Sequence, residues 1–252
     1  MKLKEIYDFL DSFAPFKSQS DFDNAGFLVG DINEEFKGAV VALDVTEGAI
    51  EYAQSIGANL IISHHPVIFE PLRSVTADGL IFRLIRSGIS VISAHTNLDM
   101  AEGGINDKLS ELLGLENVRK IVPEGEVFAA RIGEIPEEMT ADELGLYLKG
   151  IFSGAIKYCD PARPLKRIAV CSGSGGSLLE EIAKEGADAF ITADVKHNVF
   201  LDSARLDIAI YDCGHFDTED IIVSPLTDAL NERFEGGFSE YHSELIKTAE
   251  IL

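Results

Sequence analysis

The chain has 252 residues, of which 46% are hydrophobic and 25% are charged, and its formal net charge is −22. Such an acidic chain repels nucleic acid and anionic membrane surfaces, because binding to either depends on neutralising phosphate groups. No apolar stretch approaches the roughly 18 residues of a membrane span, and the three cysteines form no C-x-x-C pair for a thiolate zinc site. We therefore expect a cytoplasmic protein without a nucleic-acid or membrane partner.

The first half of the chain alternates predicted helices and strands. Apolar residues at helical spacing predict a helix over residues 3–13, and Thr46 is placed to cap a helix that ends at Gly57. A helix over 81–85 is expected to stop at Gly88. Apolar runs predict strands over 39–44, 59–63 and 89–94. Helices between strands in this way are typical of a mainly parallel sheet.

The second half partly repeats this order. Apolar runs predict strands over residues 167–171, 189–194 and 208–212. We therefore predict two related, intertwined α/β lobes with mainly parallel sheets, and a metal site at the strand ends between the lobes. The predicted boundaries are 1–125 for an N-terminal lobe and 126–252 for a C-terminal lobe. The Pro- and Glu-rich stretch 123–138 is expected to connect them.

Two adjacent histidines, His64 and His65, follow the apolar run 59–63 and precede Pro66. Proline ends a central strand, so both imidazoles are expected at the carboxyl end of a strand, where open α/β sheets bind their ligands. A single histidine there is usually a core residue. Two in succession point in different directions, and this favours a metal site with one imidazole for each of two ions.

Other predicted strand ends carry side chains of the same kind. His215 and Glu219 are four residues apart and share one face if a helix begins there. Each feature alone is weak, because such a pair is more often a surface pair and an aspartate after a strand is commonly a cap. Together they favour imidazole and carboxylate ligands for Zn²⁺, Mn²⁺, Fe²⁺ or Co²⁺. The further candidates are His95 with Asp99, Asp194 with Lys196 and His197, and Asp212.

Six ordered blocks of the sequence resemble the Nif-three-like dinuclear metal proteins, which are often named GTP cyclohydrolase 1 type 2 homologs. The block over 62–69, Ile-Ser-His-His-Pro-Val-Ile-Phe, carries the two adjacent histidines, and the block over 93–99 reads Ser-Ala-His-Thr-Asn-Leu-Asp. The remaining blocks cover residues 23–30, 42–46, 191–197 and 212–219. The resemblance extends over nearly the whole chain.

The resemblance implies a centre of two divalent ions per chain, Zn, Fe, Mn or Co. By it, His64 and His215 would bind one ion, His65 and Asp99 the other, and Glu219 would bridge them. It also implies a homohexamer, and this chain is too short for the long inserted domain that some members carry. The expected activity is hydrolysis of a nucleotide or phosphorylated small molecule, in the manner of a GTP cyclohydrolase, through a metal-activated water.

Such a reaction needs an acid or base beside the metals. His95 is the first candidate by position and Asp44 the second; the alternative for His95 is a hydrogen bond that orients a ligand. Polar residues of the matching blocks are assigned to the substrate. These are Asn24, Thr96, Asn97 and Lys196.

Two further alternatives stay open. The glycine-rich turn 172–177 lacks the spacing of a phosphate-binding loop, so it is either an anion cradle or a simple strand-to-helix turn. The alternative to a hydrolase is a non-catalytic metal-binding regulatory or scaffold protein. Structural zinc sites close with four protein ligands, often thiolates, and this favours catalysis here.

Overall fold

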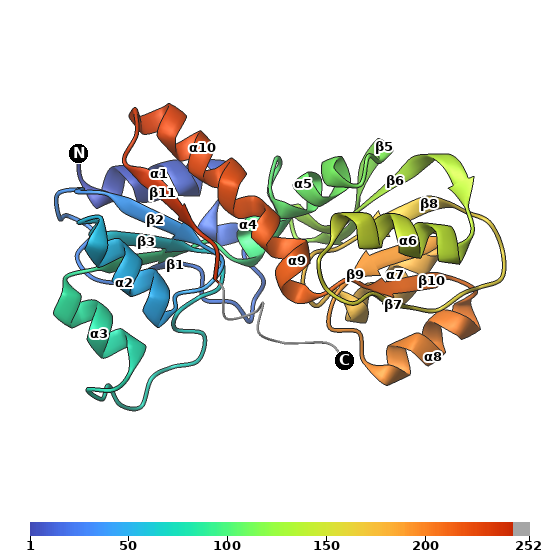
Figure 1. The fold of residues 1–252 in the computed structure, drawn as a ribbon, viewed down its shortest axis with the longest axis horizontal. Coiled ribbons are helices and arrows are strands. Elements are labelled where there is room, and N and C mark those ends of the chain that lie inside the picture. The colour runs from blue at the N-terminus through green and yellow to red at the C-terminus, as the bar shows by residue number, and fades with distance from the viewer. Residues whose placement is uncertain (244–252) are drawn as a thin grey trace. The chain divides into compact units, whose positions relative to one another are not determined.

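The computed structural model describes residues 1–243 and divides the chain into two compact units (Figure 1). The first unit contains Met1–Glu102 and the segment that begins at Ile222. The second unit is Gly103–Ile221. Each unit has its own sheet, so the fold is mixed α/β as predicted.

The sheet of the first unit has five strands in the order β1-β4-β3-β2-β11. The four strands from β4 to β11 run parallel, and β1 is antiparallel at one edge. Each of the three central strands is four buried residues long, as expected of strands covered on both faces. The bounds are β1 Gly26–Val29, β2 Ala39–Ala42, β3 Leu60–Ser63, β4 Ser90–Ser93 and β11 Phe238–Tyr241.

Two helices of the first unit begin or end at residues that the sequence marks as a cap or a stop. The Thr46 side chain accepts a hydrogen bond from the Ala49 amide (3.1 Å) at the start of α2, and Gly88 ends α3 in the left-handed conformation, φ +64°. In Figure 1, α2 and α3 lie together on one side of the sheet. The helices are α1 Leu3–Phe13, α2 Glu47–Ser55, α3 Leu80–Ser87, α4 Thr96–Met100 and α10 Val223–Phe234, with a short 3-10 turn at Phe16–Ser18.

The sheet of the second unit has six strands in the order β5-β6-β8-β9-β10-β7. Its centre, β8-β9-β10, is parallel, and its outer pairings are antiparallel. The strands are β5 Glu116–Glu124, β6 Val127–Met139, β7 Lys157–Tyr158, β8 Leu165–Val170, β9 Ala189–Thr192 and β10 Ala209–Asp212. The helices are α5 Ile105–Leu112, α6 Ala141–Ile151, α7 Leu179–Lys184, α8 His197–Leu206 and α9 His215–Glu219, with 3-10 turns at Gly176–Leu178 and Asp220–Ile222.

The central strands of the second sheet supply two cores by simple alternation. On β9, Ile191 belongs to the core beneath α6, whereas its neighbour Phe190 belongs to the core on the opposite face. Tyr211 and Ile210 divide in the same way on β10. Because both faces are covered, these strands read as continuous apolar runs, which is why the sequence revealed them.

The predicted domain boundary differs from the observed division. The stretch 123–138 forms most of the β5–β6 hairpin inside the second unit and is not a connector. The chain also returns to the first unit at Ile222, because α10 leads to β11 and β11 pairs with β2 (Phe238 with Ala39 through Tyr241 with Ala42). The predicted lobes 1–125 and 126–252 therefore cut through a hairpin and miss this return.

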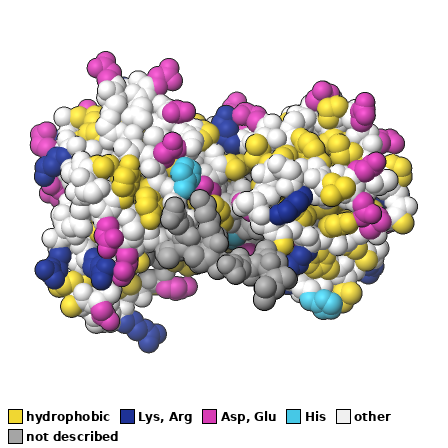
Figure 2. Space-filling model, in the orientation of Figure 1, with side chains coloured by type: hydrophobic (Ala, Val, Ile, Leu, Met, Phe, Trp, Pro, Cys, Tyr) yellow, Lys and Arg dark blue, Asp and Glu magenta, His cyan; other side chains and the backbone are white. Residues whose placement is uncertain are grey.

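The surface reflects the composition. Figure 2 shows Asp and Glu side chains over the visible face of both units, with fewer Lys and Arg side chains, as the net charge of −22 requires. Among residues 1–243, no helix combines the length and the apolar character needed to cross a bilayer.

Candidate functional site

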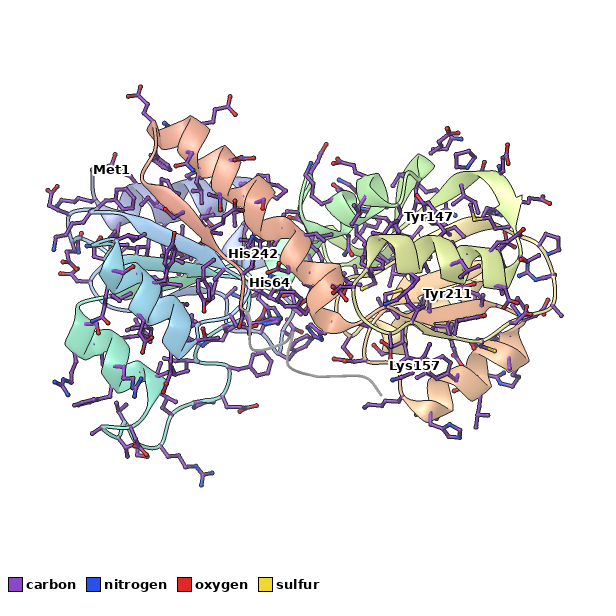
Figure 3. All side chains as sticks on the ribbon, viewed as in Figure 1. Met1, His64, Tyr147, Lys157, Tyr211 and His242 are labelled. Carbon is purple, nitrogen blue, oxygen red and sulfur yellow. The ribbon has the colours of Figure 1, made fainter. Side chains whose placement is uncertain are left out.

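His64 and His65 lie at the carboxyl edge of the first sheet, as predicted (His64 is labelled in Figure 3). Their backbone amides extend the pairing with β2: the His64 amide donates to the Ala42 carbonyl (3.2 Å) and the His65 amide to the Leu43 carbonyl (2.9 Å). The Ser63 hydroxyl donates to the His65 carbonyl (2.8 Å). The sheet therefore fixes the backbone from which both imidazoles project.

Both imidazoles are held through Nδ1. Nδ1 of His64 lies 2.9 Å from the Ala94 carbonyl, and Nδ1 of His65 lies 2.8 Å from Oδ1 of Asp44. A carbonyl oxygen only accepts, so Nδ1 of His64 carries the proton; the Asp44 carboxylate selects the same tautomer in His65. In this tautomer of the neutral ring the lone pair lies on Nε2, the arrangement found in histidines that bind metals.

His95 has the same arrangement and stands immediately before α4. Its Nδ1 lies 2.7 Å from Oδ1 of Asp23, and Oδ2 of Asp23 accepts hydrogen bonds from the Thr96 amide (3.0 Å) and hydroxyl. Burial of the Asp23 carboxyl favours its neutral form, but the hydrogen bonds from His95 and Thr96 outweigh this effect and lower the pKa of Asp23 to about 2. Asp23 is thus a fully ionised acceptor that orients His95.

The three imidazoles of the first unit converge. The ring centre of His64 lies 5.0 Å from that of His65 and 5.0 Å from that of His95, and the latter two are 5.7 Å apart. One nitrogen from each ring lies within 4.8 Å of the other two. Oδ1 of Asp99, on α4, lies 3.8 Å from Nε2 of His64. The first unit therefore gathers three imidazoles and a carboxylate at one edge of its sheet.

The second unit places His215 and Glu219 at the two ends of α9, on one face as their spacing predicted. Nε2 of His215 lies 2.9 Å from Oε2 of Glu219. Glu219 is only 3% exposed. Nδ1 of His215 lies 2.7 Å from Oδ2 of Asp194, so this imidazole is also held by an oxygen acceptor. His215 is thus the fourth histidine that is held at Nδ1, here by Asp194, and its Nε2 lies on the other side of the ring.

These donors suit a divalent transition metal. Two ligands of one tetrahedral ion, each about 2.1 Å from it, lie about 3.4 Å apart; the His215 nitrogen and the Glu219 oxygen are 2.9 Å apart, so a small separation of the two side chains would admit an ion. Imidazole nitrogens and carboxylate oxygens are ligands that Zn²⁺, Fe²⁺, Mn²⁺ and Co²⁺ accept. The two acceptors beside His65 and His215 correspond to the outer carboxylates that orient metal-binding histidines.

The residues assigned to substrate binding have structural contacts. Asn24 donates from Nδ2 to the Ile68 carbonyl (2.6 Å) and anchors the loop after the paired histidines. The Thr96 hydroxyl contacts Asp23 and accepts from the Ser20 amide (2.9 Å). Asn97 is 1% exposed and donates to the Ala14 carbonyl (2.7 Å). The structure therefore gives these three side chains a role in the fold around His95. Lys196 is exposed at the start of α8.

The glycine-rich turn 172–177 directs amides into the fold. The Ser172 amide donates to Oδ1 of Asn106 (2.8 Å), the Gly173 amide to the Thr218 hydroxyl (3.2 Å), and the Gly175 amide to the Thr192 hydroxyl (2.9 Å). An anion cradle needs such amides directed at the ligand. These contacts favour the interpretation of a strand-to-helix turn.

Asp23 and Asp194 are the residues whose orienting role sequence reasoning missed. The sequence pattern predicts only a possible ligand at a strand end for Asp194, and Asp23 stands out only as part of a block that resembles the family. Each lies at least 20 residues from the imidazole that it holds, at sequence separations of 72 and 21. The one available signal was an aspartate beside a strand or a tight loop in the same block as a candidate ligand.

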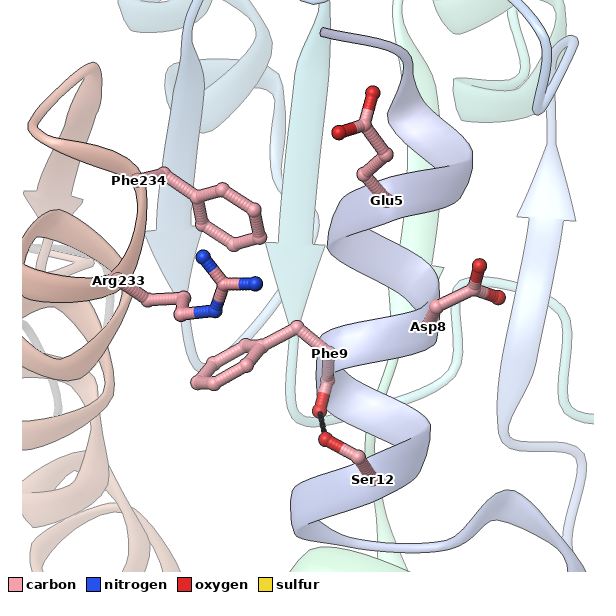
Figure 4. Close-up of a pocket in the computed structure, with 6 residues that line it drawn as sticks. All are labelled: Glu5, Asp8, Phe9, Ser12, Arg233 and Phe234. Atoms are coloured by element: carbon pink, nitrogen blue, oxygen red, sulfur yellow. Dashed lines mark hydrogen bonds between the residues drawn. The ribbon is translucent and has the colours of Figure 1, made fainter.

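A separate pocket of about 370 Å³ lies on the first unit between α1 and α10 (Figure 4). The Arg233 guanidinium lies 5.1 Å from the centre of the Phe234 ring, and the ring of Phe9 packs edge-on against Phe234 (5.6 Å). The acids at its rim have other contacts: Glu5 accepts from the Lys2 amide and Asp8 from the Lys4 ammonium group. None of its six lining residues is a histidine or cysteine.

Comparison with known proteins agrees with the fold and the motifs. The family model for Duf34/NIF3 (NGG1p interacting factor 3) matches residues 1–249. The chain is 34% identical over 248 residues to the GTP cyclohydrolase 1 type 2 homolog of Clostridium acetobutylicum, which covers 94% of this chain and 90% of that protein.

Two solved structures have the same fold. Hypothetical protein SA1388 of Staphylococcus aureus matches with a TM-score of 0.90 at 25% identity, over 100% of this chain and 99% of that chain. Reduced HcgD from Methanocaldococcus jannaschii matches with a TM-score of 0.82 at 28% identity, over 95% and 97% of the two chains.

Proposed function

Because the chain belongs to the Duf34/NIF3 family, we propose that it is a metal-dependent hydrolase that holds two divalent ions per chain. The substrate class is a nucleotide or a phosphorylated small molecule, in line with the name GTP cyclohydrolase 1 type 2 homolog borne by its relatives. The assembly that the family resemblance suggests is a homohexamer. The observation that carries the proposal is that four imidazoles are each held at Nδ1 by an oxygen acceptor.

The proposed ligands are His64 and His215 for one ion, His65 and Asp99 for the other, and Glu219 for both. This assignment gives each ion three protein ligands, fewer than the four that close a structural zinc site. Open positions are what a hydrolase needs for water and substrate. When bound, the two ions would lower the pKa of a water molecule and polarise the bond to be cleaved.

His95 is the proposed proton carrier beside the ions. Nδ1 of His95 donates a hydrogen bond to the Asp23 carboxylate and keeps its proton. Nε2 of His95 is therefore the atom that can accept a proton from water and return it to the leaving group. Its ring lies 5.0 Å from that of His64, next to the ligand cluster. Asp44, the second candidate for this task, contacts Nδ1 of His65, and this supports a role in orienting that ligand.

The experiment is metal analysis of protein purified without a metal-affinity tag. We expect close to two ions per chain in the wild type and fewer in His65→Ala and Glu219→Gln. His197→Ala is the matched control, because His197 is an exposed imidazole on α8. Unchanged metal content in both ligand variants would contradict the assignment.

Turnover separates the hydrolase from the regulatory or scaffold alternative. GTP is the first compound to test, with release of formate and of phosphate as the two readouts. Under the hydrolase proposal, His95→Ala abolishes turnover while most of the metal is retained. If the wild type binds two ions, hydrolyses none of a panel of nucleotides and phosphorylated metabolites, and dissociates when the ions are removed, the scaffold alternative is favoured.

A further inference from the structure

The turn that follows β8 runs directly against the Glu219 carboxylate. Gly173 has φ +57°, and a Cβ atom at this position would overlap Oε1 of Glu219. The same atom would lie 3.0 Å from Cδ of Glu219 and 3.3 Å from Nε2 of His215. A residue with a side chain therefore cannot occupy position 173 while Glu219 and His215 stand where they do.

The backbone at Gly173 is held in place from both sides. Its amide donates to the hydroxyl of Thr218, a fully buried residue of α9 next to Glu219 (3.2 Å). Its carbonyl accepts from the Ala193 amide (2.8 Å) and from the Thr192 hydroxyl (2.9 Å) at the end of β9. The turn can recede only by breaking buried hydrogen bonds, which is costly. A side chain here must instead displace the carboxylate.

The Glu219 carboxylate cannot move far without losing its contact with His215. Glu219 is 3% exposed, and its second oxygen lies 2.9 Å from Nε2 of His215. We infer that Gly173 is a positioning residue: the space left by its missing side chain holds the Glu219 carboxylate beside the His215 imidazole, in the arrangement of two ligands of one ion. The inference rests on the proposed function only in taking Glu219 as a ligand.

The first test is Zn²⁺ affinity, measured by competition with a chromophoric chelator. Gly173→Ala should weaken binding about 10- to 100-fold, the usual effect of disturbing the support of a ligand. Gly125→Ala is the control for backbone strain, because Gly125 has φ +61° and nothing within 4 Å of its Cβ position. Gly176→Ala is the control within the same turn, since its nearest neighbour would be 3.7 Å away. Both controls should bind Zn²⁺ like the wild type.

If Gly173→Ala binds Zn²⁺ as tightly as Gly125→Ala does, while Glu219→Gln binds it more weakly, the inference is overturned and the proposed function stands. If Glu219→Gln also binds like the wild type, the ligand assignment itself fails. The two failures are therefore distinguishable.

The second test needs no metal and remains usable if Gly173→Ala is poorly stable. Thermal unfolding of the full chain in EDTA is compared for Gly173→Ala, Glu219→Ala and the double variant. Truncating Glu219 removes the two atoms that a new Cβ would meet most closely and leaves only Nε2 of His215, at 3.3 Å. Gly173→Ala should therefore lower Tm much less in the Glu219→Ala background than in the wild type. Additive decreases in Tm would show that the two positions do not interact, and would overturn the inference.

Discussion

Oδ2 of Asp194 lies 2.7 Å from Nδ1 of His215, and Asp194 reaches it from a backbone φ of +51°. A residue other than glycine in the left-handed region costs about 1–3 kcal/mol. Aspartate and asparagine are the non-glycine residues most often found there, because their short polar side chains can form local hydrogen bonds. The fold therefore accepts local strain at the end of β9, and the result is the fixed orientation of one imidazole.

We predict that Asp194→Ala weakens Zn²⁺ affinity about 10- to 100-fold, because the His215 ring loses its acceptor. Asp194→Asn should have a smaller effect, since asparagine tolerates the backbone conformation and its Oδ1 still accepts. The measurement is chelator competition. Asp207→Ala is the control, because Asp207 also has a positive φ (+55°) but contacts no imidazole. Equal affinity in Asp194→Ala and Asp207→Ala would contradict the prediction.

Substitution of Asp44 separates its two candidate roles. If Asp44 orients His65 through the 2.8 Å contact, Asp44→Ala lowers both metal content and metal affinity, again by about 10- to 100-fold. If Asp44 is the acid or base of the reaction, the variant keeps its metal and loses turnover. We expect the first result. Asp8→Ala, which removes an exposed carboxylate paired with Lys4, is the control for loss of charge.

Asp23 should make the stability of the fold depend on acid pH. Its pKa of about 2 in the folded chain lies below the ordinary value of 3.8. The ionised carboxylate therefore stabilises the fold above about pH 4, and this contribution is lost as the pH falls from 4 to 2. Urea unfolding should show Asp23→Asn to be about 2 kcal/mol less stable at pH 6, with the difference shrinking below pH 4. A difference that stays constant down to pH 2.5 would be inconsistent with this role.

The buried Arg131 provides a test of stability in the second unit. Its side chain is 0% exposed and pairs through Nε with Asp107, while Nη1 donates to the Phe128 carbonyl (2.9 Å). Asp107→Ala removes the carboxylate from a buried charge and should lower the free energy of unfolding by about 3 kcal/mol. Urea denaturation measures this change. Glu111→Ala, which breaks the exposed pair with Lys108, should cost less than about 1 kcal/mol. Similar losses in the two variants would refute the argument.

Local chemistry in the sequence was enough to predict much of the alternating pattern. The helix over Leu3–Phe13, the Thr46 cap and the Gly88 stop are all present, because each depends on residues within a turn or two. The buried strands were visible as apolar runs for the same reason. The β5–β6 hairpin was missed, since a Pro- and Glu-rich composition resembles a connector whatever the chain pairs with.

The candidate site also has one part that the sequence predicts and another that depends on the tertiary structure. The sequence by itself determined which residues can serve as ligands, because imidazoles and carboxylates after apolar runs are recognisable from residue type and spacing alone. Only the tertiary structure decided which acceptor fixes each ring: Ala94, Asp44, Asp23 and Asp194 lie 21 to 72 residues from their histidines. It also decided that β11 returns to β2 and that Gly173 stands against Glu219. Contacts between distant segments depend on strand pairing and on the position of each turn, and no local pattern of residues encodes them.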